Sequence, residues 1–321
     1  MIEYFISEGI FMSNRKVDTV IIGAGTAGLY ALSEVKKSGR SWLLIQGGED
    51  GTTCARVGCM PSKVLLKTAE LFNSKDQFAS QGILGSSHIE VDPVAVMTHL
   101  RKMRDMFTDG VRSRTTERMD DIHLIRGYAE FIGKNSLVVN GQVIEFENAI
   151  VATGSSPVIP TPWQNLENVY TTDSFFEIEQ LPSSTAIIGM GAIGLEMGQA
   201  LSQLGVRVAG FDQAQTIAGI QDASLLEDAI KTFSSNFPIY LGEPVTFKQG
   251  DSGGVTVIQN GIEKSFDTVL IAMGRRSNIL NMNLEAAGAT IIDGHVAFDE
   301  QTMSVDGTSL FIAGDSTSER A

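Results

Sequence analysis

The sequence has few cysteines, few prolines and no long apolar stretch. Only 2 of its 321 residues are cysteine and 8 are proline. Two cysteines are too few for the disulfide scaffold of a small secreted protein, and they cannot supply all four ligands of a zinc site. They indicate a reducing compartment, so we expect a cytoplasmic location. No apolar run approaches the roughly 20 residues that a membrane-spanning helix needs, so we expect no membrane partner.

Basic residues are also scarce relative to acidic ones. Lys and Arg number 24 against 38 Asp and Glu, which gives a formal net charge of −14. A surface of that sign repels phosphate backbones, so we expect no nucleic-acid partner. The 43% of hydrophobic residues predicts a folded, soluble protein. Single cores stop growing near about 250–300 residues, so the length indicates about two domains.

The first residues do not resemble a secretion signal. Glu3 and Glu8 interrupt the apolar segment, no basic region precedes it and no small-residue cleavage site follows. Met12 is an alternative start. In that case residues 1–11 precede the folded protein without regular order, and MSNRK is a short polar lead into the first strand.

One pattern occurs twice along the chain. VDTVIIG at residues 17–23 is a β-branched run that leads into GAGTAG, a helical segment and a second strand, SWLLI. The same order recurs as TAIIG, GMGAIG, LEMGQALSQLG and VRVAGF. The interval from the first glycine to the end of the second strand is 23 positions in both copies, Gly23 to Gln46 and Gly189 to Asp212. The repeat predicts an α/β protein with two nucleotide-binding domains, each containing a βαβ unit.

A second repeated element follows each βαβ unit. SLVVNGQVIEF and VTVIQNGIEKSF both place Asn-Gly between two alternating runs, which predicts a β-hairpin with a type I′ turn. Each hairpin leads to a buried strand that ends in glycine, 13 positions on: Gly141 to Gly154 and Gly261 to Gly274. Residues 93–118 are predicted to form one amphipathic helix, to which we assign no chemistry.

The glycine-rich turns are candidate pyrophosphate sites. A strand, a G-x-G-x-x-G turn and a helix place backbone N–H groups and the positive end of the helix dipole at a bound phosphate. The alternative is a tight strand-to-helix turn without a ligand, and the second copy in the same context makes that alternative weaker. The candidate glycines are Gly23, Gly25 and Gly28 in the first copy and Gly189, Gly191 and Gly194 in the second.

The residue that ends each second strand is the candidate partner of a ribose. Gln46 occupies this position in the first copy and can still hydrogen-bond a hydroxyl, with less charge assistance than a carboxylate. Asp212 occupies it in the second copy, where a carboxylate binds a ribose 2′-hydroxyl and repels a 2′-phosphate. No arginine follows within QAQTIAG to neutralise such a phosphate. We therefore expect the second site to prefer NAD over NADP.

The two cysteines lie close together in the sequence. Pro61 is tolerated in the first turn of a helix, so Cys59 is predicted to lie just ahead of a helix N-terminus with Lys63 one turn inside it. The helix dipole and the lysine both favour a thiolate. A bridge between Cys54 and Cys59 needs an irregular turn, which Gly58 permits.

Two other interpretations of the cysteines remain open. Free cysteines often serve as small core residues. A metal half-site would need two further ligands, and we predict no metal site because the four histidines are scattered, at His88, His99, His123 and His295.

The cysteine motif resembles a known signature. Cys54-x4-Cys59-Met60-Pro61-Ser62-Lys63 near a first glycine-rich turn is similar to the redox-active motif of the class I pyridine nucleotide–disulfide oxidoreductases, the flavoprotein group of dihydrolipoamide dehydrogenase, glutathione reductase and mercuric reductase. AIVATGSSPVIP, GMGAIGLEMG, VLIAMGRRSN and TSLFIAGD follow in the order of that family. The resemblance extends from about residue 17 to the end.

The resemblance implies two Rossmann-like, three-layer domains, with the NAD domain inserted into the FAD domain. The expected limits are 1–153 for the first part of the FAD domain, 154–274 for the NAD(P) domain and 275–321 for the second FAD part. Cys59 would stack against the flavin in a charge-transfer complex, Cys54 would be the exposed thiol that exchanges with substrate, and Lys63 would pair with Glu196. The implied FAD residues are Gly23, Gly25, Gly28, Gln46, Thr53, Lys63, Thr153, Gly154 and Asp315. The implied NAD residues are Gly189, Gly191, Gly194, Asp212 and Gly274.

The expected activity is electron transfer between NAD(H) and a small disulfide or dithiol such as lipoamide, through FAD and the Cys54–Cys59 disulfide. Dihydrolipoamide dehydrogenase is the most similar type. Another reductase of the group, acting on mercuric ion or a glutathione-like disulfide, is an alternative. A catalytically idle FAD/NAD-binding module is a second, and an NADH–flavin oxidase that does not use the disulfide is a third.

The sequence also departs from the family pattern. Gly51-Thr52-Thr53 stands where relatives usually have Gly-Gly-Thr, Arg56 replaces a usual Asn, and Gln46 replaces the usual acid. The family continues beyond its Gly-Asp with a helix and a dimerisation domain that carries a His-Glu acid/base pair. STSERA, with Glu319, is interpreted as the first turn of that helix. We therefore expect a homodimer for the full-length protein, and weakened disulfide exchange and flavin retention for the 321 residues alone.

Overall fold

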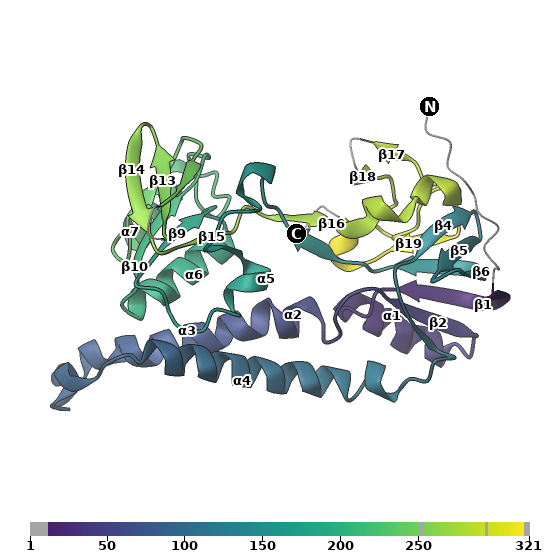
Figure 1. The fold of residues 1–321 in the computed structure, drawn as a ribbon, viewed down its shortest axis with the longest axis horizontal. Coiled ribbons are helices and arrows are strands. Elements are labelled where there is room, and N and C mark those ends of the chain that lie inside the picture. Colours follow the sequence, from purple (N-terminus) through teal and green to yellow (C-terminus); the bar gives the residue numbers. More distant parts are fainter. Residues whose placement is uncertain (1–11, 251–252, 293–294, 318–321) are drawn as a thin grey trace. The chain divides into compact units, whose positions relative to one another are not determined.

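The computed structural model describes residues 12–250, 253–292 and 295–317 (Figure 1). The chain divides into two compact units, and each is described by itself. Unit 1 contains residues 1–53, 108–156 and 276–321, and unit 2 contains residues 54–107 and 157–275. Each unit is built around its own sheet with parallel strands. The predicted α/β fold class with two Rossmann-like sheets is therefore confirmed. The predicted domain limits placed residues 54–107 in the first domain, and they stay a prediction.

Unit 1 contains a seven-stranded sheet of order β3-β2-β1-β6-β5-β4, with β19 also paired to β6. The pairs among β1, β2, β3, β6 and β19 are parallel, whereas β4-β5 and β5-β6 are antiparallel. Its strands are β1 (Met12–Ile22), β2 (Trp42–Gln46), β3 (Leu124–Arg126), β4 (Glu130–Gly133), β5 (Ser136–Val139), β6 (Gln142–Val151) and β19 (Leu310–Ile312). The two-residue strands β17 (Ile291–Ile292) and β18 (His295–Val296) form a separate antiparallel pair.

Unit 2 contains a five-stranded parallel sheet of order β11-β10-β9-β15-β8 and an antiparallel sheet of order β12-β13-β14. The parallel strands are β8 (Val169–Thr171), β9 (Ser184–Ile188), β10 (Arg207–Phe211), β11 (Ile239–Tyr240) and β15 (Thr268–Ile271). The antiparallel strands are β12 (Thr246–Gln249), β13 (Val255–Gln259) and β14 (Ile262–Phe266). A short pair, β7 (Ser155–Pro157) and β16 (Arg275–Ser277), completes the strands of the described residues.

The helices follow the strands in the order expected of βαβ units. The α-helices are α1 (Thr26–Lys37), α2 (Thr53–Arg56), α3 (Cys59–Asn73), α4 (Pro93–Arg112), α5 (Thr172–Phe175), α6 (Ala192–Gln203) and α7 (Ala223–Ser234). The 3-10 helices are η1 (Ser74–Gln77), η2 (Ala79–Gln81), η3 (Ser86–His88), η4 (Thr116–Arg118), η5 (Thr161–Trp163), η6 (Asn278–Met282), η7 (Leu284–Ala287) and η8 (Gly314–Thr317).

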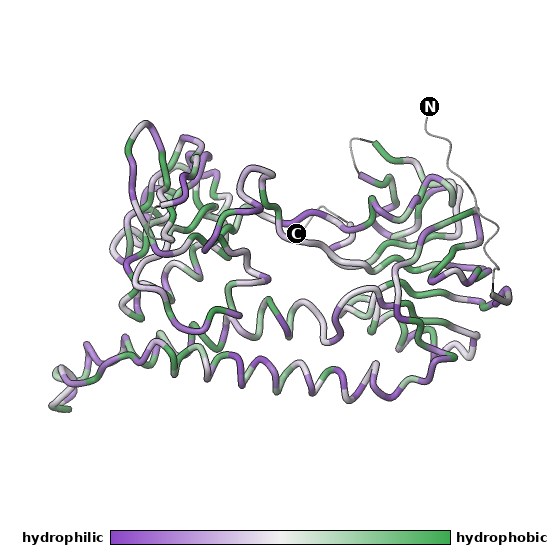
Figure 2. Tube along the Cα trace, in the orientation of Figure 1, coloured by the Kyte–Doolittle hydropathy of each residue, from purple (hydrophilic) through white to green (hydrophobic). Residues whose placement is uncertain are grey.

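The central strands of both sheets are apolar, and they form the cores. Every residue of β9 and β15 is buried, as expected of strands covered on both faces. In unit 1, Val20 and Ile21 point to opposite faces of β1, and both are fully buried in separate apolar clusters. Figure 2 shows this concentration of hydrophobic residues in the strands of each sheet. The turns at the carboxyl ends of these strands are thereby anchored to the two cores.

The first strand is longer than the sequence predicted. The segment 12–16 was expected to be a polar lead, but β1 begins at Met12. It does so because β6 runs beside it in parallel as far back as the pair Met12 and Gln142, with a register shift before Arg15. The hydrogen bonds of the partner strand, rather than the side chains of the segment, extend β1.

Both Asn-Gly hairpins are confirmed. Asn140 and Gly141 have φ values of 50° and 76°, and Asn260 and Gly261 have 52° and 73°, as a type I′ turn requires. The strands after them differ. In unit 1 the single strand β6 runs from the hairpin into the core, whereas in unit 2 the chain divides into β14 and β15 at Asp267. The Asp267 carboxylate there accepts a hydrogen bond from the Ser184 N–H at 2.9 Å.

The predicted helix over residues 93–118 is shorter in the structure. α4 ends at Arg112, and η4 follows after a break at Thr115, whose φ of −127° and ψ of −96° are not helical. Figure 2 shows hydrophilic and hydrophobic residues alternating along α4, which fits an amphipathic helix. Within the described ranges, no helix combines the length and apolar character needed to span a bilayer.

Two expectations concern the ends of the chain. Residues 1–11, expected to lack regular order, lie outside the described residues. The expected first turn of a helix in STSERA is described only as far as Thr317, where η8 ends, and Glu319 also lies outside the described residues.

Candidate functional site

The two glycine-rich turns have the same backbone geometry. Gly23 and Gly189 follow β1 and β9 with φ values of +107° and +101°, a region that favours glycine. A Cβ atom at Gly28 would lie 1.9 Å from the Gly23 carbonyl oxygen, and one at Gly194 would lie 1.9 Å from that of Gly189. Any side chain at these positions would therefore separate the helix from the turn.

The middle glycine of each turn faces open space. Gly25 and Gly191 are the N-caps of α1 and α6, and a Cβ atom at either would meet no other atom within 4 Å. A glycine N-cap has no side chain to accept the first N–H groups of its helix, and the structure shows no such capping bond at either position. The first N–H groups of both helices thus remain available to an anion. The space and the donors fit one dinucleotide pyrophosphate in each unit.

The residues at the ends of β2 and β10 brace these turns in the same way. Gln46 Oε1 accepts the Ala24 N–H at 2.6 Å, and Asp212 Oδ2 accepts the Met190 N–H at 2.7 Å. Their remaining polar atoms differ. Gln46 Nε2 donates to a backbone carbonyl at 3.1 Å, whereas Asp212 Oδ1 accepts the Ala214 N–H at 2.9 Å. Asp212 retains lone pairs and a negative charge for a ribose hydroxyl, while Gln46 offers a neutral amide.

Residues from the ends of β6 and β19 meet the turn of unit 1. A Cβ atom at Gly23 would lie 3.2 Å from the Thr153 amide nitrogen, and one at Gly314 would lie 2.8 Å from the Ala27 Cβ atom of α1. Thr153 and Gly314 are therefore packed against the same turn. Asp315, next to Gly314, is exposed and available to a ligand.

A buried polar centre supports this junction, and the sequence prediction missed it. Ser316 is fully buried, and its Oγ accepts the Gly154 N–H at 2.8 Å and lies 3.4 Å from Thr153 Oγ1. Asn278 Nδ2 donates to the Thr153 carbonyl at 3.0 Å, and the Asn278 N–H donates to the Gly154 carbonyl at the same distance. The only sequence signal was the position of Ser316 beside Asp315 and of Asn278 at the end of the RRSN string.

Gly274 occupies the equivalent place in unit 2. A Cβ atom at Gly189 would lie 2.4 Å from the Ala272 carbonyl oxygen, so the end of β15 packs against the second turn. The Gly274 carbonyl accepts the Val158 N–H at 3.0 Å. Arg275 beside it forms an ion pair with Asp173 at 2.7 Å.

The loop between Gln46 and α2 carries its own strain. Thr52 has a φ of +61°, which costs a β-branched residue about 1–2 kcal/mol. This is the position where relatives usually have glycine. Thr53, one of the expected FAD residues, is exposed and begins α2.

Asp50 of the same loop is largely buried, with 9% of its side chain exposed. One carboxylate oxygen bonds to Arg126 at 2.7 Å, while the other oxygen is buried without a protein partner.

The two cysteines lie together at the start of α3. Cys54 belongs to the short helix α2, and α3 begins at Cys59 itself, one or two residues earlier than expected, with Gly58 as its N-cap. The break between the helices lets the Cys54 thiol hydrogen-bond Cys59. Both are free thiols, with Cys54 partly buried and Cys59 exposed. The irregular turn predicted from Gly58 is present.

The Cys54 thiol holds its proton strongly. Burial is the main reason why its pKa is raised to about 11, and the hydrogen bond and the charge of Cys59 act in the same direction. A buried thiolate is poorly solvated, and a second negative charge beside a Cys59 thiolate is unfavourable. The pair therefore disfavours a negative charge on Cys54.

Lys63 is one turn inside α3, and the structure brings it to Glu196 of α6. Lys63 Nζ lies 2.8 Å from Glu196 Oε1 and 2.9 Å from Oε2. Both side chains are about half exposed, so this ion pair contributes at most about 1 kcal/mol to stability. It joins the first turns of α3 to α6.

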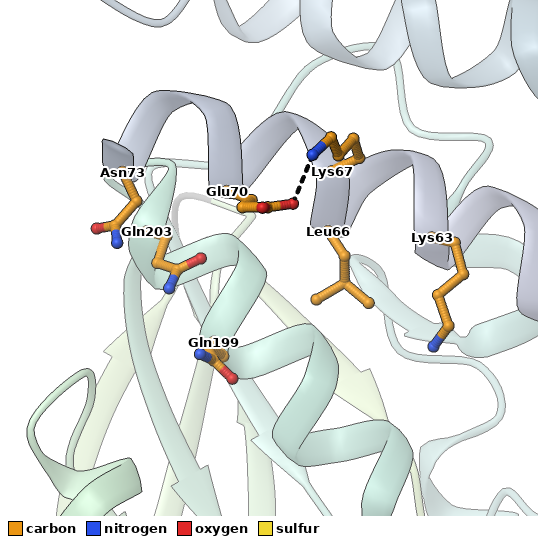
Figure 3. Close-up of a pocket in the computed structure, with 7 residues that line it drawn as sticks. All are labelled: Lys63, Leu66, Lys67, Glu70, Asn73, Gln199 and Gln203. Atoms are coloured by element: carbon orange, nitrogen blue, oxygen red, sulfur yellow. Dashed lines mark hydrogen bonds and ion pairs between the residues drawn. The ribbon is translucent and has the colours of Figure 1, made fainter. Parts of the chain in front are cut away.

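A pocket of about 390 Å³ lies between α3 and α6 (Figure 3). Figure 3 shows Leu66 pointing toward α6 and Lys67 bound to Glu70, an ion pair of 2.8 Å within α3. The pocket is lined by Lys63, Leu66, Lys67, Glu70, Asn73, Gln199 and Gln203. We assign it no ligand.

The described residues contain no group of three or more His, Cys, Asp and Glu side chains placed to hold a metal ion. Three of the four histidines, His88, His99 and His123, lie in or beside η3, α4 and β3, far apart in the sequence. His123 Nδ1 lies 2.7 Å from Asp120 Oδ1 on the surface.

Known proteins resemble the chain over nearly its full length. Residues 17–321 match the family model described as pyridine nucleotide-disulphide oxidoreductase. A mercuric reductase of Staphylococcus aureus is 29% identical over 96% of this chain and 57% of its own length. A dihydrolipoyl dehydrogenase of Vibrio parahaemolyticus is 28% identical over 94% of this chain and 65% of its own length. Dihydrolipoyl dehydrogenase 3 of Pseudomonas putida is 30% identical over 95% of this chain and 68% of its own length.

Solved structures show the same fold. The HOCl-induced flavoprotein disulfide reductase RclA of Escherichia coli superposes with a TM-score of 0.81 at 23% identity, covering 95% of this chain and 67% of its own. The chain spans about 57% to 65% of the length of the first two curated relatives. The matched glycine-rich turns, the paired thiols and the family match lead to one conclusion: the chain belongs to the class I pyridine nucleotide–disulfide oxidoreductases, flavoproteins whose members bind FAD and NAD(P).

Proposed function

We propose that the chain transfers electrons between NADH and a small disulfide through FAD and the Cys54–Cys59 pair. The observation that carries this proposal is the presence in one chain of two matching dinucleotide turns and two thiols within hydrogen-bonding distance. Dihydrolipoamide dehydrogenase-like activity is the specific form that we propose, with lipoamide as substrate. For the whole protein we propose a homodimer in the cytoplasm, the latter supported by the free thiols.

The cofactors are assigned to separate units. Unit 1 would hold FAD, and this is the proposed FAD domain: its residues are Gly23, Gly25, Gly28, Gln46, Thr53, Thr153, Gly154 and Asp315. Unit 2 would hold NAD, through Gly189, Gly191, Gly194, Asp212 and Gly274. We propose NAD rather than NADP because both Asp212 oxygens already brace backbone N–H groups, which fixes a carboxylate where a 2′-phosphate would lie.

Bound FAD would accept a hydride from NADH and supply two electrons for reduction of the disulfide. The overall step is NADH + H⁺ + disulfide giving NAD⁺ + dithiol. The dithiol then exchanges with a substrate disulfide, so that the Cys54–Cys59 bond forms, the substrate S–S bond breaks and two substrate thiols leave. Lys63, one turn after Cys59, is the first cation of α3 beside this exchange.

Attack on the substrate is assigned to Cys54, whose raised pKa imposes a requirement. A thiol with a pKa of about 11 is almost fully protonated at neutral pH. A base must therefore take the Cys54 proton before the sulfur attacks.

Reduction of mercuric ion is the second candidate. The S. aureus relative is named a mercuric reductase, and two adjacent thiols are suitable ligands for a soft cation. Here the dithiol would bind the ion and NADH would supply the two electrons that reduce it.

Steady-state NADH oxidation by protein from the complete reading frame tests these proposals. Lipoamide, mercuric ion and a dye acceptor are compared in the wild type and in Cys54→Ser and Cys59→Ser. Lipoamide turnover that both variants abolish supports the proposed activity, and turnover of mercuric ion alone supports the second candidate. Undiminished lipoamide turnover in Cys54→Ser would contradict the disulfide mechanism and support an oxidase. Inactivity with every acceptor at full flavin loading would support a non-catalytic module.

A further inference from the structure

Tyr128 is an aromatic residue held by a rigid backbone but with its ring open to solvent. It follows β3, and 81% of it is exposed. The backbone on its N-terminal side is fixed, because the Gly127 N–H donates to the Gln46 carbonyl at 2.9 Å and Asn140 Nδ2 donates to the Arg126 carbonyl at 2.7 Å. Phe131, three residues later, is fully buried in the core. The exposed ring is therefore not on a loose loop.

The ring lies next to the end of β2. A Cβ atom at Gly47 would come within 2.6 Å of Tyr128 Cδ1 and 2.8 Å of Cε1, so one part of the ring covers the Gly47 backbone. The remaining surface of the ring faces outward. Gly47 directly follows Gln46, which braces the glycine-rich turn.

The order of the strands places the ring along the path of a dinucleotide. The sheet order is β3-β2-β1, with all pairs parallel, so the carboxyl ends of the three strands share one edge. Along this edge lie the turn after β1, then Gln46 after β2, then Tyr128 after β3. A dinucleotide binds outside the carboxyl ends of such strands, with its pyrophosphate at the helix N-terminus and its ribose at the second strand. The base then extends toward the third strand.

The corresponding position of unit 2 shows that the fold does not need an aromatic ring here. Gly242 donates its N–H to the Asp212 carbonyl at 3.1 Å, the same bond that Gly127 makes in unit 1. The residue after it is Glu243, which is exposed. Two equivalent loops thus carry a ring in one unit and a carboxylate in the other, so packing does not explain Tyr128.

We propose that Tyr128 is a stacking platform for the adenine ring of FAD, and that it makes the adenosine half of the cofactor a main source of binding affinity. The proposal rests on the assignment of FAD to unit 1. Stacking of a base on an aromatic side chain is worth about 1–3 kcal/mol by alanine substitution, which corresponds to roughly 5- to 150-fold in affinity.

The test measures FAD affinity rather than activity. Flavin-free protein from the complete reading frame is titrated with FAD, and binding is followed by the change in flavin fluorescence, for the wild type and for Tyr128→Ala, Tyr128→Phe and Tyr30→Ala. Tyr30 is an exposed tyrosine of α1 in the same unit, at 71% exposure, and is the matched control. Displacement of FAD by ADP, which contains adenine but no flavin, is measured in parallel.

We expect Tyr128→Ala to weaken the binding of FAD and of ADP by the same factor, about tenfold or more. The affinities of Tyr128→Phe and Tyr30→Ala for both ligands should stay within about twofold of the wild type. The melting temperature of flavin-free Tyr128→Ala should be unchanged, because the ring is exposed. An FAD affinity of Tyr128→Ala within twofold of the wild type overturns this proposal alone. A wild type that binds no FAD overturns the proposed function and this inference with it.

Discussion

The two glycine-rich turns have nearly the same backbone but different surroundings. Gly23 and Gly189 have φ values within 6° of each other, and the close contacts at Gly28 and Gly194 are the same. The side chains beyond the turns differ, with Gln46 and Tyr128 in unit 1 and Asp212 and Glu243 in unit 2. From this comparison we propose that the backbone of each turn provides a general pyrophosphate site, while a few side chains at the strand ends select the nucleoside.

The largest expected effect comes from filling the close contact in one unit at a time. Gly28→Ala puts a methyl group 1.9 Å from a backbone oxygen, so we expect a loss of about 3 kcal/mol in stability and a roughly 100-fold loss of FAD affinity. Gly194→Ala should do the same to NADH binding and leave FAD binding intact. Denaturant unfolding and ligand titration measure both.

Gly25→Ala is the matched control for this prediction. A Cβ atom there meets no atom within 4 Å, so the fold should be retained while FAD affinity falls, since the methyl group enters the space of the pyrophosphate. Loss of NADH binding in Gly28→Ala, with no loss of FAD binding, would contradict the assignment of the units.

The second prediction concerns the thiol pair at the start of α3, which belongs to unit 2. Because the pKa of Cys54 is about 11 against an ordinary 9.0, its thiolate fraction at neutral pH should be about 100-fold below that of an ordinary thiol. Alkylation of Cys54 by iodoacetamide, followed by mass spectrometry, should accelerate about tenfold per pH unit until the pH approaches 11. Cys59→Ala removes the hydrogen bond and the neighbouring charge, so it should lower the pKa of Cys54 and speed its alkylation. A Cys54 rate that already levels off near pH 9 would refute the assignment.

The third prediction concerns the residues at the carboxyl ends of β2 and β10, Gln46 and Asp212. Gln46→Glu keeps the acceptor for the Ala24 N–H and adds a charge, so FAD affinity should rise by up to about tenfold through a charge-assisted bond to the ribose. Asp212→Asn should weaken NADH binding by about tenfold. It should also reduce the preference for NADH over NADPH, because the repulsion of a 2′-phosphate is lost. Isothermal titration with each nucleotide measures these changes. An unchanged preference in Asp212→Asn would show that another residue selects the nucleotide.

The smallest effect is expected from the loops that follow the second strands. Thr52 and Ala218 both have positive φ values, 61° and 52°, but only threonine is β-branched. Thr52→Gly should raise the free energy of unfolding by about 1 kcal/mol, and Ala218→Gly should raise it by less. Equal effects of the two substitutions, measured by chemical denaturation, would mean that the branched side chain adds no strain.

Local patterns were sufficient to predict much of the fold. The two βαβ units, both Asn-Gly hairpins and the helix after the cysteines depend on glycine, asparagine and apolar spacing, and they are present. The errors occur where distant segments decide. β1 extends to Met12 because β6 pairs with it, and α4 ends at Arg112 although the amphipathic spacing continues. Neither outcome is encoded in the residues of the segment itself.

The candidate site shows the same division. The glycines and cysteines were found from their spacing, because such chemistry requires those residues in that order. Ser316 and Asn278 were missed, although they hold Thr153 and Gly154 through bonds that join positions more than 100 residues apart. Tyr128 gave no signal in the sequence either, since its proposed role depends on its place beside Gly47.

The sequence by itself determined the family, the two turns and the presence of a thiol pair, because each depends on backbone conformations that only certain residues adopt. Only the tertiary structure decided which groups are buried or exposed around those motifs. It placed the Cys54 thiol partly out of solvent and beside Cys59, which raises its pKa, and it left the Tyr128 ring open at the edge of the sheet. Solvation and neighbouring charge are set by contacts between distant segments, and no local pattern records them.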